Sequence, residues 1–114
     1  MDDLKMIRVQ ISDFIAVVTM DNPPVNAQNA ELQEEMIRAF DRISDLDEAR
    51  VAVLTGSGKC FCAGVDIKAR AGTQRGPGDA WRGMRYAREC FHAIMECRKP
   101  VIAAINGPAL GAGL

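Results

Sequence analysis

The stretch KCFCAGVDIKA, residues 59–69, holds the residues that most suggest chemistry: two cysteines, a glycine and a lone acid. Structural zinc sites combine two short cysteine pairs, each with typically two to four intervening residues. Cys60 and Cys62 are too close for that pattern, and Cys90 and Cys97 lie far apart on an expected helix. A disulfide framework belongs to secreted chains, and the first residues show no secretory signal. We therefore interpret the four cysteines as reduced, partly buried thiols and predict no metal site.

Two glycine-rich turns suggest a different chemistry, one that uses backbone N–H groups. They are TGSGKCFCAGVDIK and INGPALGAGL, and each follows an apolar run typical of a buried strand. Small residues at the carboxyl end of a strand let a ligand approach the backbone. Two such turns side by side could place two N–H donors on one oxygen, as a developing oxyanion requires. The alternative interpretation is that both turns are only tight connections.

Composition limits the classes of function. The chain has 114 residues, with 14 basic and 15 acidic side chains and a formal net charge of −1. This balance provides no broad basic surface for nucleic acid or an anionic membrane, and the apolar runs are too short to span a bilayer. Dinucleotide and phosphate-loop glycine patterns are absent. We expect one small, cytoplasmic domain that binds neither nucleic acid nor membrane.

Hydrophobic periodicity predicts alternating strands and helices. The expected strands are residues 6–11, 13–21, 50–56 and 101–105, and the expected helices are residues 29–44 and 79–97. Asn29 is the expected cap of the first helix. The second helix is expected to share one apolar face among Met84, Ala87, Phe91, Ile94 and Met95.

This order predicts an α/β fold with an initial hairpin and largely parallel pairing. The strand at 50–56 is almost entirely apolar, so we expect both of its faces to be covered. The last strand runs almost directly into the end of the sequence. We therefore expect the sheet to be incomplete.

Three segments resemble the crotonase superfamily, which contains the enoyl-CoA hydratases and isomerases. They are NPPVNAQN, LTGSGKCFCAGVDIK and KPVIAAINGPALGAGL, in the order and spacing of that family. The resemblance spans roughly residues 9–114. It implies a crotonase-like ββα spiral core, of which residues 1–114 would be the N-terminal part of a single acyl-CoA-binding domain.

The resemblance also implies a site that acts through the backbone. Acyl-CoA thioesters would be the substrates, and the N–H groups of Val65 and Ala112 would hold the enolate oxygen. A glycine is usual at the position of Ala112. Substrate contacts would come from Val25, Ala27, Ala63, Gly64, Asp66, Ile67 and Gly111. Coenzyme A would be part of the substrate, no further cofactor is implied, and the expected assembly is a homotrimer or hexamer.

The acid and base of the hydratases would be two glutamates that follow the last glycine of the triplet, which is Gly113 here. Leu114 is the last residue given, so the sequence would carry the binding and oxyanion half without the acid–base half. Asp66 is expected to cap a turn, and His92 to lie on a helix surface. The alternatives are an isomerase or thioester hydrolase of the same superfamily, a non-catalytic acyl-CoA-binding or assembly subunit, and a thiol or metal protein.

Overall fold

The computed structural model describes residues 3–65 and 77–114. Four strands form one sheet in the order β1-β2-β3-β4. The strands are β1 (Ile7–Ser12), β2 (Ile15–Met20), β3 (Val51–Gly56) and β4 (Val101–Ala103). β1 and β2 are antiparallel, whereas β2, β3 and β4 are mutually parallel, as expected for an α/β fold with an initial hairpin. The carboxyl ends of the three parallel strands therefore lie at one end of the sheet.

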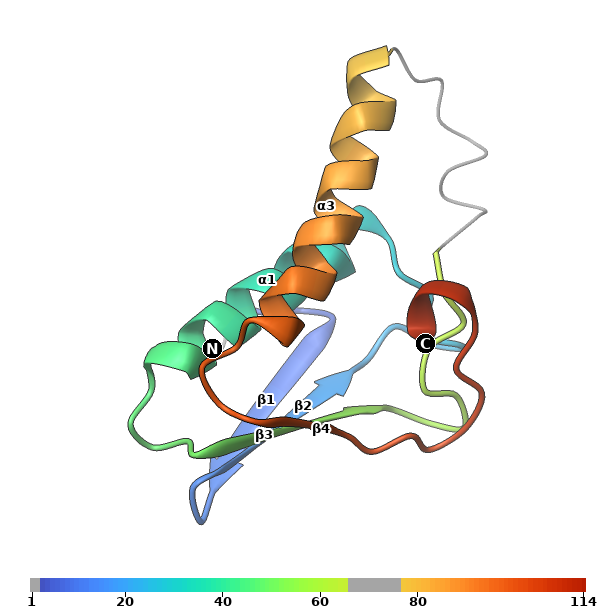
Figure 1. The fold of residues 1–114 in the computed structure, drawn as a ribbon. Coiled ribbons are helices and arrows are strands. Elements are labelled where there is room, and N and C mark those ends of the chain that lie inside the picture. The colour runs from blue at the N-terminus through green and yellow to red at the C-terminus, as the bar shows by residue number, and fades with distance from the viewer. Residues whose placement is uncertain (1–2, 66–76) are drawn as a thin grey trace.

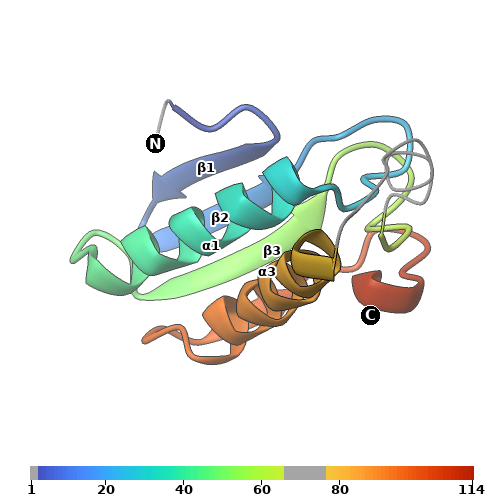
Figure 2. The same ribbon diagram turned by 90° about the horizontal axis from the view of Figure 1, so that it is seen from above.

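Two long helices, α1 (Ala30–Asp45) and α3 (Pro77–Met95), lie over the same face of the sheet (Figures 1 and 2). The Asn29 side chain caps α1 by accepting a hydrogen bond from the Leu32 N–H at 2.8 Å, as predicted. A short 3₁₀ helix, η1 (Gly111–Gly113), ends the chain. In the described part of the chain, no helix is long and apolar enough to cross a membrane.

The core lies between the helices and the covered face of the sheet. It is formed by alternate residues of the strands and by one face of α1, and includes Ile7, Ala16, Val18, Met20, Leu32, Met36, Phe40, Ile43 and Leu54. The prediction that β3 is covered on both faces is wrong for the described residues. Ala52 and Leu54 are buried, but Val51 and Val53 are only half-buried, because both helices lie on one face.

The second helix and the last strand also differ from expectation. Met84 and Met95 are 71% and 77% exposed, whereas Cys90, which was not assigned to the apolar face, is buried. Only the C-terminal half of α3 packs against the core, and its N-terminal half projects away from the sheet (Figure 1). β4 ends at Ala103 and not at Ile105. The apolar period located the helix correctly but not the residues that the core covers.

All four cysteines are free thiols, and Cys60, Cys62 and Cys90 are buried. Burial, reinforced by the charge of Cys62, raises the pKa of the Cys90 thiol to about 12. That thiol is therefore protonated and unreactive at neutral pH. Among the described residues, no group of three or more His, Cys, Asp or Glu side chains is arranged to hold a metal ion.

Lys99 secures the C-terminal end of α1. Its ammonium donates to the carbonyl oxygens of Ile43, Leu46 and Ala49 at 3.2, 2.6 and 2.7 Å. These carbonyls follow or end the helix, where a positive charge is favourable. Because Lys99 lies just before β4, this contact also fixes where β4 enters the sheet.

Glu35 anchors the start of β1 to α1. Its side chain is almost fully buried, and Oε1 accepts hydrogen bonds from the N–H groups of Lys5, Met6 and Ile7 at 2.7, 2.8 and 3.2 Å. A carboxylate that accepts several backbone N–H groups forms stronger hydrogen bonds than a neutral acceptor. Glu35 thus positions the first strand of the sheet.

We expect Glu35→Gln to lower the free energy of unfolding by about 2 kcal/mol, because a neutral acceptor replaces a charged one in three hydrogen bonds to a largely buried side chain. Urea denaturation measures the loss. Glu34→Gln is the matched control, since Glu34 is an exposed neighbour on the same helix, and it should change stability by less than about 0.5 kcal/mol. Equal losses in the two variants would show that Glu35 does not anchor β1.

Candidate functional site

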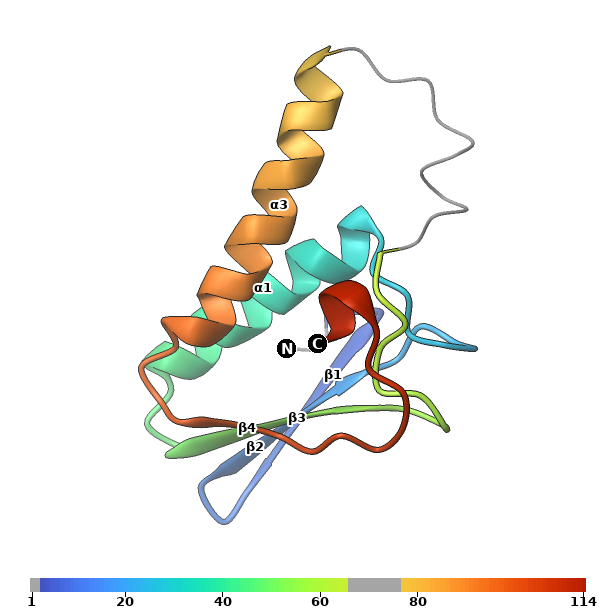
Figure 3. The same cartoon turned by 45° about the vertical axis from the view of Figure 1, so that its right-hand side comes forward.

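Three loops meet at the carboxyl ends of the parallel strands (Figure 3). They follow β2, β3 and β4, and isolated bridges join Gln28 to Val65 and Cys62 to Ala109. The Leu110 N–H donates to the Cys62 carbonyl at 3.0 Å. The two glycine-rich turns therefore lie side by side, as the sequence predicted.

Two asparagines hold these loops together from either side. Asn26 is fully buried, and its Nδ2 donates to the carbonyl of Cys60 at 2.9 Å. Asn106 donates to the carbonyl of Gly58 at 3.0 Å and accepts from the N–H of Gly56 at 3.2 Å. The turn after β3 is thus joined to the loop after β2 by Asn26 and to the loop after β4 by Asn106. Sequence reasoning assigned neither asparagine a role.

Two glycines, which have no side chain, let the two turns approach each other closely. Gly64 has φ of +94°, and a Cβ there would lie 2.9 Å from the Leu110 oxygen and 3.5 Å from the Ala112 nitrogen. A Cβ on Gly113 would overlap the carbonyl of Cys62. A larger residue at Gly64 or Gly113 would push the two turns apart. The backbone of Gly64 therefore lies beside that of Ala112 because both positions are glycine.

The N–H groups predicted to act together are both available. In the trans peptide between Gly64 and Val65, the carbonyl accepts a hydrogen bond from the Gln28 N–H at 2.7 Å, so the Val65 N–H points the opposite way. Within residues 3–65 and 77–114, neither the Val65 N–H nor the Ala112 N–H has an acceptor. Buried backbone N–H groups are nearly always paired, and more exposed ones bond to water, which a ligand can replace. Val65 and Ala112 are half-buried. Two such donors on adjoining turns therefore mark a candidate site for an acceptor atom.

The backbone conformation at position 112 does not require a glycine. Its φ is not positive, in contrast to Gly111 at +53°. An alanine therefore fits the backbone without strain and retains its N–H. The departure from the usual glycine leaves the donor intact.

An apolar cavity of about 340 Å³ adjoins η1, between the sheet and α3. Its lining includes Phe61, Cys62, Cys90, Ala112 and Gly113. An apolar chain attached to a group held by the donors would have a compatible surface beside it.

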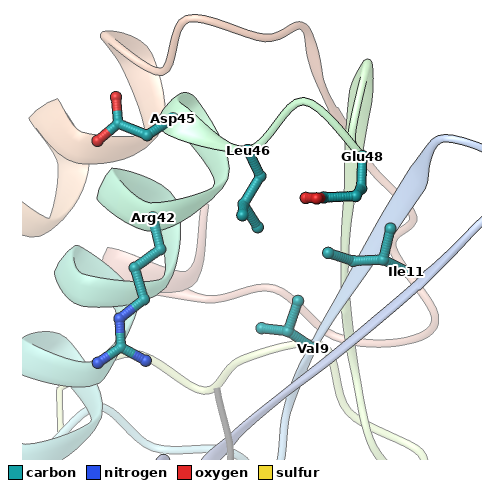
Figure 4. Close-up of a pocket in the computed structure, with 6 residues that line it drawn as sticks. All are labelled: Val9, Ile11, Arg42, Asp45, Leu46 and Glu48. Atoms are coloured by element: carbon teal, nitrogen blue, oxygen red, sulfur yellow. The ribbon is translucent and has the colours of Figure 1, made fainter.

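A larger groove, of about 690 Å³, lies at the opposite end of the sheet between α1 and β1 (Figure 4). Its one basic residue, Arg42, forms two hydrogen bonds with Asp3 at 2.7 and 2.8 Å. The Arg42 guanidinium holds the pKa of Asp3 well below its usual range. Because this cation is already paired and Asp45 and Glu48 are acidic, the groove is a poor site for an anionic ligand.

The structure brings together most of the predicted substrate contacts. The Ala63 N–H donates to the Val25 carbonyl at 3.0 Å, so the loop after β2 lies against the turn that contains Gly64. Val25 and Gly111 are exposed, and Ala27 is half-buried. Asp66 and Ile67 lie outside the described residues.

His92 lies away from this site. It is exposed on α3, where its Nδ1 is 3.3 Å from the Glu96 carboxylate. Sequence reasoning missed Gln28, whose buried side chain donates to the Ala112 carbonyl at 3.2 Å. A single glutamine in a loop after two prolines carries no signal that would have identified it.

Comparison with known proteins places these features in a family. The family model for enoyl-CoA hydratase/isomerase matches residues 10–114. Enoyl-CoA hydratase EchA19 of Mycobacterium tuberculosis is 40% identical over 101 residues, covering 85% of this chain and 37% of the relative. A protein of Rhodobacter capsulatus named "Probable enoyl-CoA hydratase" is 42% identical over 112 residues, covering 94% of this chain and 40% of the relative.

A solved structure agrees with the sequence relatives. The crystal structure of an enoyl-CoA hydratase from Bacillus anthracis superposes with a TM-score of 0.87 and 31% identity, covering 96% of this chain and 43% of that one. The chain thus spans about two fifths of the length of these relatives, with the same fold over that part. The resemblance predicted from three motifs is confirmed, and the chain belongs to the enoyl-CoA hydratase/isomerase family.

Proposed function

We propose that this chain supplies the acyl-CoA-binding and oxyanion-stabilising part of an enzyme of the hydratase/isomerase type. The observation that supports the proposal is a pair of N–H groups, on Val65 and Ala112, that have no acceptor among the described residues and belong to two turns in backbone contact. The relatives named enoyl-CoA hydratase support a thioester substrate.

In this proposal the thioester carbonyl oxygen accepts a hydrogen bond from each of the two N–H groups. Negative charge grows on that oxygen as the enolate forms, and donors that are already fixed need no rearrangement to stabilise it. Each such donor typically lowers the barrier by about 3–4 kcal/mol. The turns that carry the donors are fixed by the buried Asn26 and the exposed Asn106, which suits a preorganised site.

The rest of the substrate would lie along the loops that flank the donors. Val25, Ala27, Ala63, Gly64, Asp66, Ile67 and Gly111 are the proposed contacts for coenzyme A and the thioester. The acyl chain would enter the apolar cavity beside Ala112. We assign the acid and base to residues beyond Leu114, by resemblance to the hydratases, and the homotrimer or hexamer stays a prediction on the same ground.

A calorimetric titration of the full-length protein tests this proposal. Butyryl-CoA, which cannot be hydrated, should bind at least about tenfold more tightly than S-butyl-CoA, a thioether that lacks only the carbonyl oxygen, because two hydrogen bonds are lost. Equal affinities would contradict carbonyl recognition. Binding of butyryl-CoA without hydration of crotonyl-CoA would favour the non-catalytic acyl-CoA-binding subunit.

The close approach of the two turns predicts a difference between two glycines. Gly58 and Gly64 both have positive φ, +73° and +94°, but a Cβ on Gly58 meets nothing within 4 Å. Both alanine substitutions should lower the free energy of unfolding by about 1 kcal/mol, because alanine disfavours a positive φ. Gly64→Ala should lose, in addition, at least about a hundredfold in kcat for crotonyl-CoA hydration, since displacement of the donors is costly. Equal kcat values for the two variants would show that the contact does not matter.

A further inference from the structure

We propose that Gln28 is a positioning residue that sets the spacing of the two oxyanion donors, an inference that rests on the proposed function. Gln28 lies just before α1, in the loop that follows β2, and is only 6% exposed. In the described part of the chain it alone forms hydrogen bonds with the backbone of both Gly64 and Ala112.

The backbone of Gln28 orients the first donor. Its N–H donates to the Gly64 carbonyl at 2.7 Å. That carbonyl and the Val65 N–H belong to one planar peptide group, so they point in opposite directions. Because Gln28 holds the Gly64 carbonyl toward the loop after β2, the Val65 N–H points away from that loop.

The side chain of Gln28 holds the second turn. Its Nε2 donates to the Ala112 carbonyl at 3.2 Å and lies 3.4 Å from the Cys62 sulfur. The Ala112 carbonyl is next to the N–H of the same residue, so its position limits how far the second donor can move. One residue thus ties both donor segments to the same point of the loop.

A second glutamine orients the Gln28 amide. The Nε2 of Gln33 lies 3.4 Å from the Gln28 Oε1, and Gln33 is also 6% exposed. With its oxygen facing Gln33, the Gln28 amide presents its nitrogen to Ala112. Burial of two amides costs free energy of desolvation that an apolar pair would not cost. A role in positioning the donors would explain why amides are present here.

The test compares Gln28→Met with Lys99→Met in the full-length protein. Methionine keeps the length and volume of glutamine and removes the donor. Lys99 also donates to backbone carbonyls, but it lies before β4, at the opposite end of the sheet from the donor turns. Lys99→Met is therefore a matched control for the stability lost with a side chain that holds backbone carbonyls.

Two measurements report on positioning and not on folding. The carbonyl stretch of butyryl-CoA labelled with ¹³C at the thioester carbon shifts to lower frequency when the donors polarise the carbonyl. We expect Gln28→Met to reduce this shift and to lower kcat for crotonyl-CoA hydration about tenfold, with KM changed less than about twofold. Lys99→Met should retain the shift and kcat.

The outcomes separate the inference from the function on which it rests. A wild-type protein that shows no carbonyl shift would overturn the proposed function. A normal shift and kcat in Gln28→Met would overturn only the positioning role. If Gln28→Met does not fold, Gln28→Asn replaces it, because a side chain one methylene shorter cannot span to Ala112 and should give the same loss.

Discussion

The backbone contact between the turn after β3 and the turn after β4 is the constraint on which the site depends. The contact exists because Gly64 and Gly113 carry no side chain, so the carbonyls of Leu110 and Cys62 can lie where a Cβ would otherwise stand. The parallel order of β2, β3 and β4 brings the turns to one end of the sheet, and Asn26, Asn106 and Gln28 fix them there.

The chemistry proposed for this site is carried by peptide groups. The sequence also offers conventional reactive groups. The lone histidine is exposed on α3 beside Glu96, and the buried Cys90 thiol is protonated at neutral pH. Backbone donors do not depend on residue type, so Ala112 can serve where glycine is usual. What the site does depend on is small residues and buried amides that hold the donors in place.

Much of this arrangement could be predicted from sequence because it follows from local rules. Apolar periodicity located the hairpin and both helices, Asn29 marked a helix start, and the alternation of strands and helices implied that the glycine turns adjoin. The faces covered in β3 and α3 could not be predicted, since periodicity identifies an apolar stripe and not the element that packs on it. Gln28 was missed because the role proposed for it depends on a hydrogen bond to a residue 84 positions along the chain.

An ester in place of one amide tests the central claim most directly. Replacing Ala112 in the full-length protein by its α-hydroxy acid analogue removes the N–H and leaves the methyl group and the chain length unchanged. Backbone stabilisation of the enolate predicts a fall in kcat for crotonyl-CoA hydration of about a hundredfold or more. The affinity for free coenzyme A should not change. An unaltered kcat would show that the Ala112 N–H does not hold the oxyanion and would contradict the account.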